Sequence, residues 1–361
     1  MKLSKTINRI ILPNLEGYFK SQSNDLINLT IGEPDFDVHK KVKQKLLNCS
    51  NSRFKYSSSK GNTILREQIA DHINNQNKTQ YTKDNILITT GSSYSLFLAY
   101  QTLFDRDDEI IIFEPYFPPY IELAKIVGAK PKVIPTFPTF IPELSQISKK
   151  ISTKTKAILL NSPSNPTGRI YTKEFLLEVV KLAKKHDLFI ISDEVYKDFD
   201  YDNKFLSPAE FYYKTIVVNS FSKSHAATGL RIGYLCGPVE VIEAANKLLF
   251  LEQVCVADFI QELFVDNLDI SQKASKIYKK NRDMVIKELG GNFKFVIPDG
   301  GFYFFIKCPS EEKIFVAELA KKGVLVMPGS IFSSRKDYFR ISLISDKIKL
   351  KKALEIIKSV L

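Results

Sequence analysis

Residues that can do chemistry follow five short apolar segments of this 361-residue chain. Each segment is followed at once by small polar, aromatic, acidic or basic side chains. These five groups are residues 91–94, 114–117, 161–168, 192–196 and 219–223. Together they supply a glycine-serine turn, an aromatic pair, an amide, a carboxylate and a lysine. The stability of the fold alone does not require polar and charged residues of these types after all five segments.

The residue types in these groups indicate what kind of ligand they would hold. Backbone N–H groups of residues 91–93, before an expected helix, can bind a phosphate, and Ser220 and Arg231 can add a hydroxyl and a guanidinium. Asp193 can keep a pyridine nitrogen protonated, because a nearby negative charge favours the cationic form. Lys223 can form a Schiff base with an aldehyde and then act as a general acid and base. These properties together suit pyridoxal 5'-phosphate (PLP).

The apolar segments must place these groups at one edge of a sheet. Their continuous apolarity, and the helical patterns between them, predict an α/β fold with a mainly parallel sheet sandwiched by helices. In such sheets, ligands bind just beyond the carboxyl ends of the strands. Strands are expected at residues 86–90, 109–113, 156–160, 188–191, 215–218 and 232–235. Helices are expected at residues 63–75, 95–104 and 172–186.

The last third of the chain has a different pattern and predicts a smaller α/β domain. Short strands are expected there at residues 293–297, 301–306, 324–327 and 339–343. We predict a large domain of residues 40–275 that holds the cofactor. Residues 1–39 and 276–361 are expected to form the small domain together.

Residues 220–233, Ser-Phe-Ser-Lys-Ser-His-Ala-Ala-Thr-Gly-Leu-Arg-Ile-Gly, resemble the PLP-attachment signature of class I and II aminotransferases. Asn-Pro-Thr-Gly at 165–168 and Asp-Glu-Val-Tyr at 193–196 match two further motifs of that family, in the same order. The resemblance extends from residues 29–36 to 339–342, nearly the whole chain. It implies PLP fold type I and a homodimer with shared active sites. It also implies a ping-pong exchange of the amino group between an L-amino acid and a 2-oxo acid.

The resemblance also implies roles for single residues around the cofactor ring. Lys223 would carry the cofactor as a Schiff base and shuttle the proton. Asp193 would pair with the pyridine nitrogen, and Asn165 and Tyr196 with the ring oxygen. Lys223, Asp193 and Tyr196 are therefore the candidate catalytic residues.

The phosphate of the cofactor has its own set of expected partners. By the same resemblance, Ser92, Ser93, Ser220 and Arg231 hold the phosphate. Tyr56 is expected to reach the phosphate of the other subunit.

The remaining positions concern the ring face and the substrate. Phe117 is expected to stack on the cofactor, and a shift by one residue to Tyr116 stays open. Gly32 would bring backbone close to the substrate. Arg340 would bind the α-carboxylate of the substrate, with Asn165 as a further contact.

Two other residues near these motifs have less defined roles. His225, beside the attachment lysine, is expected to be structural. Lys60 could meet a distal carboxylate of an acidic substrate, but a solvated lysine is the favoured interpretation.

Composition argues against several other classes of protein. The net charge of +12 comes from lysines scattered in pairs, which favours a solvated basic surface over a nucleic-acid site. No run of eighteen apolar residues occurs, so no membrane span is expected. Residues 1–5 lead into a mixed segment without the apolar core of a secretion signal. The four cysteines form no CxxC pair. We therefore expect no metal site and a reducing, cytoplasmic location.

Three alternatives to an aminotransferase can be compared with the same sequence. A PLP-dependent carbon–sulfur β-lyase would show the same lysine, aspartate and arginine. A PLP-binding regulator would need a DNA-binding domain, for which the chain has no spare length. A nucleic-acid-binding protein has only the net charge in its favour.

The substrate stays open among aspartate, aromatic, diaminopimelate-type and glutamine-type donors. The turn at residues 91–94 lacks the lysine of some aspartate-specific relatives, which weakens the case for aspartate.

Overall fold

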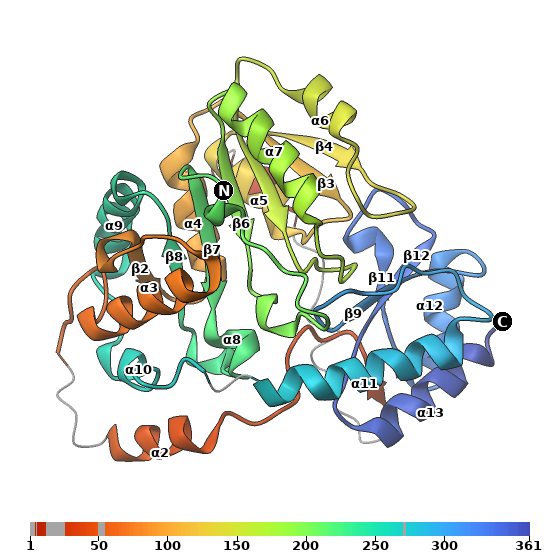
Figure 1. The fold of residues 1–361 in the computed structure, drawn as a ribbon. Coiled ribbons are helices and arrows are strands. Elements are labelled where there is room, and N and C mark those ends of the chain that lie inside the picture. Colours follow the sequence, from red (N-terminus) through yellow and green to blue (C-terminus); the bar gives the residue numbers. More distant parts are fainter. Residues whose placement is uncertain (1–3, 5, 12–25, 50–54, 270–271) are drawn as a thin grey trace.

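The computed structural model describes residues 4, 6–11, 26–49, 55–269 and 272–361. The expectation of no secretion signal concerns residues 1–5, of which all but residue 4 lie outside the described residues. Two bodies of structure are visible in Figure 1, one built on a large sheet and one on a smaller group of strands and helices. The predicted boundaries at residues 39/40 and 275/276 stay predictions.

The large sheet has seven strands in the order β2-β8-β7-β6-β5-β3-β4. Only β8 runs antiparallel to its neighbours, so the carboxyl ends of the other six strands share one edge. The strands are β2 (Ile86–Thr89), β3 (Glu109–Glu114), β4 (Lys130–Pro135), β5 (Thr155–Asn161), β6 (Phe189–Asp193), β7 (Thr215–Ser220) and β8 (Gly233–Cys236). This arrangement confirms the predicted α/β fold with a mainly parallel sheet.

The central strands are continuously apolar because their alternate residues pack on opposite faces of the sheet. In β3, Ile110 and Ile112 pack into one core cluster, and Ile111 and Phe113 pack into another. Successive side chains of a strand point to opposite faces, so a sheet covered on both faces needs apolar residues at every position.

Helices cover both faces of the large sheet (Figure 1). One face packs against α4 (Ser92–Leu103), α5 (Pro119–Val127) and α9 (Val239–Gln253). The other face packs against α3 (Thr63–Asn77), α6 (Leu144–Lys150) and α7 (Lys173–Lys185). The remaining helices of this body are α2 (Lys40–Asn48), α8 (Phe221–Ser224) and α10 (Asp258–Glu262).

The second body packs around an apolar core that also includes side chains from the N-terminal part of the chain and from residues 195–201. Its antiparallel sheet has the order β11-β12-β9, with β9 (Tyr303–Lys307), β11 (Met327–Pro328) and β12 (Tyr338–Ser342). A parallel pair joins β1 (Ile27–Asn28) to β10 (Val324–Leu325). Its helices are α11 (Gln272–Leu289), α12 (Glu312–Lys321) and α13 (Lys347–Lys358). Ile27 and Leu29 lie in the same core cluster as residues of β9, β12 and α13.

Three local expectations were wrong, and one strand was missed. Residues 293–297 form no strand, because Phe295 makes only an isolated bridge to Ile306. Residues 324–327 form two strands that belong to different sheets. The helix expected from residue 95 begins at Ser92, and β4 was missed altogether. β4 contains Pro131 and Pro135 and lies at the sheet edge, where a missing backbone donor is tolerated.

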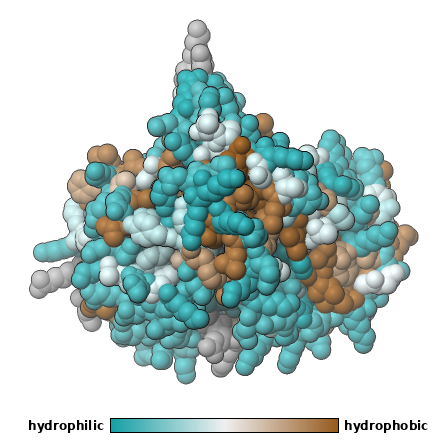
Figure 2. Space-filling model, turned by 45° about the horizontal axis from the view of Figure 1, so that its top comes forward, coloured by the Kyte–Doolittle hydropathy of each residue, from teal (hydrophilic) through white to brown (hydrophobic). Residues whose placement is uncertain are grey.

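The face of the molecule that Figure 2 shows is mainly hydrophilic. Figure 2 shows hydrophobic residues gathered near the centre of the viewed face, between hydrophilic ones. Among the described helices, none combines the length and the apolar character that crossing a bilayer requires.

Candidate active site

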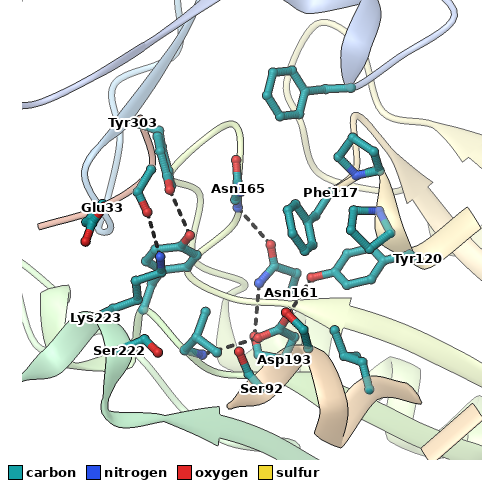
Figure 3. Close-up of a pocket in the computed structure, with 18 of the residues that line it drawn as sticks. Glu33, Ser92, Phe117, Tyr120, Asn161, Asn165, Asp193, Ser222, Lys223 and Tyr303 are labelled. Carbon is teal, nitrogen blue, oxygen red and sulfur yellow. Dashed lines mark hydrogen bonds between the residues drawn. The ribbon is translucent and has the colours of Figure 1, made fainter. Parts of the chain in front are cut away.

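A cavity of about 590 Å³ lies at the carboxyl edge of the large sheet, where the two bodies meet. The large body contributes residues that follow β2, β3, β5, β6 and β7. The segment before α2 contributes residues 30–33, and the second body contributes Tyr303, Met327 and Arg340. Figure 3 shows the polar side chains of these elements pointing toward one another. The sheet topology therefore brings distant parts of the sequence to one site.

The first turn of α4 forms one end of the cavity. Ser92 and Ser93 line it, and the N–H groups of a first helical turn have no partner within the helix. Arg231 lines the same end, with its Nη1 donating to the Thr228 carbonyl at 2.9 Å. Gly91 has a φ of +81°, and a Cβ there would lie 2.6 Å from Arg231 Nη2. Glycine thus lets the guanidinium lie directly against the turn that begins the helix.

Asp193 is a buried carboxylate at the end of β6. Its Oδ2 accepts a hydrogen bond from the Tyr120 hydroxyl at 2.7 Å, and its Oδ1 accepts one from the Val195 N–H at 3.3 Å. Burial raises the pKa of Asp193 to about 6, and the Tyr120 hydrogen bond acts in the opposite direction. Among the described residues, Asp193 has no cation within ion-pair distance. It is therefore placed to receive a cationic or protonated group from a ligand.

Lys223 extends from α8 into the centre of the cavity, and its Nζ donates to the Gly32 carbonyl at 2.6 Å (Figure 3). Burial lowers the pKa of Lys223 to about 8, which the negative charge of Glu33 partly offsets. Gly32 has no room for a side chain, because a Cβ there would lie 2.3 Å from the Tyr303 hydroxyl. The lysine amine is thus held next to backbone, in a state that can lose its proton near neutral pH.

Arg340 is a buried cation on β12 without a carboxylate partner among the described residues. Its Nη1 donates to Asn165 Oδ1 at 2.9 Å, and its Nη2 donates to the Thr30 carbonyl at 2.5 Å. The guanidinium lies between the rings of Tyr303 and Phe332, 4.4 and 4.7 Å from their centroids. Its Nε is buried and has no hydrogen-bond partner. Burial lowers the pKa of Arg340, so an anionic ligand would relieve an unfavourable charge.

Two amides and two tyrosines complete the polar wall. Asn161 Nδ2 donates to the Asp193 carbonyl at 3.0 Å, and Asn161 Oδ1 accepts from the Asn165 N–H at 2.7 Å. The hydroxyls of Tyr196 and Tyr303 lie 2.8 Å apart. These contacts fix the positions of Asn165 and Tyr196 relative to Lys223.

Ten of the twelve predicted site residues line this one cavity. They are Gly32, Ser92, Ser93, Phe117, Asn165, Asp193, Tyr196, Lys223, Arg231 and Arg340. Phe117 lines the cavity and Tyr116 does not. Tyr116 instead donates its N–H to the Phe332 carbonyl at 2.9 Å.

The structure does not bring Ser220 and Tyr56 to the cavity. Ser220 is buried, and its Oγ accepts the Ser222 N–H as the cap of α8. Ser222, two residues later in the same motif, lines the cavity instead. Tyr56 is 83% exposed, and its expected role concerns a second subunit.

Sequence reasoning missed several residues that shape the site. Tyr120, Asn161, Tyr303 and Phe332 all line the cavity and contact predicted site residues. Asn161 had a signal, because it is the polar residue that ends the apolar strand β5. The other three lie away from the quoted motifs, so only the folded chain reveals them.

Lys60 and His225, the two residues with less defined roles, both contact residues that do not line the cavity. Lys60 Nζ forms an ion pair with Glu243 and lies 3.9 Å from Asp84 Oδ1. His225 is buried, with its ring nitrogens 2.8 Å from Ser224 Oγ and 2.9 Å from the Asn267 carbonyl. These contacts give both residues structural roles within this chain.

The lowered pKa of Lys223 can be tested on the cofactor-free protein. We expect the rate of amine labelling at Lys223 to rise with pH around a midpoint near 8, whereas an ordinary lysine has a pKa of about 10.4. Glu33→Gln should move this midpoint lower, because Glu33 favours the charged amine. Competitive labelling followed by peptide mass spectrometry measures both. A midpoint near 10 at Lys223 would contradict the assignment.

Comparison with known proteins gives the family of the chain. The sequence model of the family described as aminotransferase class I and II matches residues 24–357. Aspartate aminotransferase from Thermotoga maritima is 34% identical over 349 residues, which cover 94% of this chain and 92% of the relative. The crystal structure of a Thermotoga maritima aspartate aminotransferase superposes with a TM-score of 0.94, at 32% identity and 99% coverage of both chains. Aspartate aminotransferase from Thermus thermophilus with maleate gives a TM-score of 0.95, at 30% identity and 100% coverage of both chains.

These matches extend over nearly the whole chain and agree with the resemblance that the motifs carried. The structural neighbours also confirm the expected fold. The chain therefore belongs to the class I and II aminotransferase family.

Proposed function

We propose that this aminotransferase uses PLP to exchange the amino group between an L-amino acid and a 2-oxo acid in a ping-pong sequence. The observation that carries the proposal is the convergence of Lys223, Asp193 and Arg340 on one cavity. Burial disfavours the charged form of all three side chains, and Arg340 has no carboxylate partner among the described residues. A ligand with complementary charges would stabilise them.

The residues present fit the ring of PLP. Asp193 is buried and has no cation within ion-pair distance among the described residues, so a protonated ring nitrogen would supply a direct positive partner. Asn165 and Tyr196 would provide a donor for the ring oxygen, and Phe117 an apolar face for the ring. Tyr120 would hold the Asp193 carboxylate in place.

The opposite end of the cavity fits a phosphate. The first turn of α4 offers unpaired N–H groups and the positive end of the helix dipole. Arg231 adds a full positive charge, and the hydroxyls of Ser92 and Ser93 add donors. We infer that Ser222 takes the place expected for Ser220, because Ser222 is the member of that motif that lines the cavity.

When bound to Lys223, PLP would act as the electron sink that lets the substrate lose its α-proton. Arg340 would bind the α-carboxylate with two parallel N–H donors and so orient Cα toward Lys223. A pKa near 8 lets Lys223 take the proton from Cα and return it at neutral pH, since a general base works best near the operating pH. The exclusion of water by Tyr303 and Phe332 would strengthen these charge interactions.

We further propose a homodimer and a cytoplasmic location. Tyr56 and Leu251 are 83% and 80% exposed in the single chain, and a dimer interface would cover side chains of this kind. In a dimer, Tyr56 would reach the phosphate site of the partner. The cytoplasmic location rests on the four cysteines without a CxxC pair.

A donor panel with the PLP-loaded enzyme tests the reaction. We expect a donor to convert the cofactor absorbance only once without a 2-oxo acid, and repeatedly when one is added. Matched assays for ammonia and sulfide release should stay at background. Release of ammonia or sulfide without any 2-oxo acid would instead identify a β-lyase.

A further inference from the structure

We propose that the side-chain pocket of this enzyme is built for a bulky apolar or aromatic amino acid and disfavours a dicarboxylic one. The inference rests on the proposed function, which assigns the α-carboxylate to Arg340 and the cofactor to Lys223 and Arg231. It differs from the substrate named for the relatives, which is aspartate.

The charges around the cavity provide the first argument. Among the described residues that line it, the only cations are Lys223, Arg231 and Arg340, and each has a role with the cofactor or the α-carboxylate. The remaining charged residues are the acids Asp193, Glu33 and Glu122, of which Asp193 is assigned to the cofactor ring. Glu33 accepts a hydrogen bond from Thr228, and Glu122 accepts one from the Ile11 N–H at 2.9 Å and forms an ion pair with Lys125 at 2.8 Å. Within one chain, a second substrate carboxylate would thus find acids and no free cation among the described lining residues.

The walls beside Arg340 provide the second argument. The apolar residues of the cavity include Ile31, Phe117, Pro118, Met327, Ile331 and Phe332. This wall lies close to the expected position of the substrate carboxylate, because the Arg340 guanidinium is 4.7 Å from the centroid of the Phe332 ring. Met327 is the strand partner of Arg340. A substrate whose carboxylate binds Arg340 therefore has an apolar surface next to its side chain.

The two apolar walls are joined across the cavity. The Tyr116 N–H donates to the Phe332 carbonyl at 2.9 Å and so ties the loop of Phe117 to the turn that carries Ile331 and Phe332. A pocket whose two walls are joined by a hydrogen bond can enclose a ring or a branched side chain of the substrate. Contact with such a surface excludes water and favours apolar side chains over charged ones.

Two measurements on the PLP-loaded enzyme test this inference. The first is the single-turnover half-reaction with phenylalanine, leucine or aspartate, followed by cofactor absorbance. We expect kcat/KM for phenylalanine to exceed that for aspartate at least ~10-fold, within the range that apolar pockets achieve. The second is calorimetric binding of 3-phenylpropionate against maleate, which needs no turnover. We expect 3-phenylpropionate to bind more tightly, whereas maleate is the ligand named with the Thermus thermophilus relative.

A matched pair of variants tests whether Ile331 lies next to the side chain of the bound substrate. Ile331→Lys would add the missing cation, so maleate affinity and aspartate turnover should both rise ~10-fold. Ile331→Met keeps the wall apolar and should leave the order of ligands unchanged. Equal effects of the two variants would overturn the inference.

The outcomes separate this inference from the proposed function. Preference for aspartate and maleate in the unaltered enzyme would overturn the apolar pocket while leaving amino transfer intact. Failure of every donor to transfer its amino group would overturn the proposed function, and the binding comparison would still decide the character of the pocket.

Discussion

Replacing Lys223 with alanine is expected to lower the rate of amino transfer by ~10⁴-fold, at the upper end of what general acid–base catalysis contributes. Lys223 is the only lysine among the described residues that line the cavity. It is also the group proposed to move the proton at Cα. Steady-state kinetics with the best donor measures the loss, and the absorbance of the bound cofactor reports whether PLP still has an amine to bond.

Two further variants make this result specific. Lys223→Arg keeps a positive charge, but a guanidinium does not lose its proton in proteins, so we expect the same loss. Lys149→Ala removes an exposed lysine from α6 and should keep full activity. If Lys223→Ala kept more than a tenth of the activity, the assignment of this lysine would be wrong.

Replacing Arg340 with methionine is expected to reduce kcat/KM by roughly 10²- to 10⁴-fold. The range follows from two hydrogen bonds to a charged ligand, each contributing about 1.5–3 kcal/mol. Most of the loss should be in KM, because the α-carboxylate is bound equally in the ground state and the transition state. Kinetics under initial-rate conditions separates KM from kcat.

Arg340→Lys is the matched control for geometry. Lysine keeps the charge but lacks the planar fork that holds a carboxylate with two parallel bonds. We expect its kcat/KM to lie between those of the methionine variant and the unaltered enzyme. An unchanged KM in Arg340→Met would show that the α-carboxylate binds elsewhere, provided that circular dichroism shows both variants to be folded.

The central sheet and the main site residues could be predicted because their signals are local. A strand covered on both faces must be apolar throughout, which makes β3 and β5 visible in the sequence. Asp193 and Asn165 then follow from the rule that parallel strands deliver the residues after them to one edge. The short β4 escaped prediction because its two prolines are typical of loops.

Interactions between distant segments could not be predicted in this way. Tyr120 reaches Asp193 from a helix 73 residues earlier in the chain, and nothing near either residue indicates the contact. The same holds for the Arg340 guanidinium between Tyr303 and Phe332. The choice between Ser220 and Ser222 depends on where α8 begins, since the residue that caps a helix turns its oxygen toward the backbone.

The amino-acid chain alone was enough to infer the family, the fold class and the lysine, aspartate and arginine on which the proposed chemistry depends. Those features rest on residue type, order and spacing along the chain, which folding does not alter. Folding sets which side chains are buried together, which charges lack a partner among the described residues and how apolar the substrate pocket is. These properties arise from packing between segments hundreds of residues apart, such as Thr30 and Arg340, whose contact no local pattern encodes.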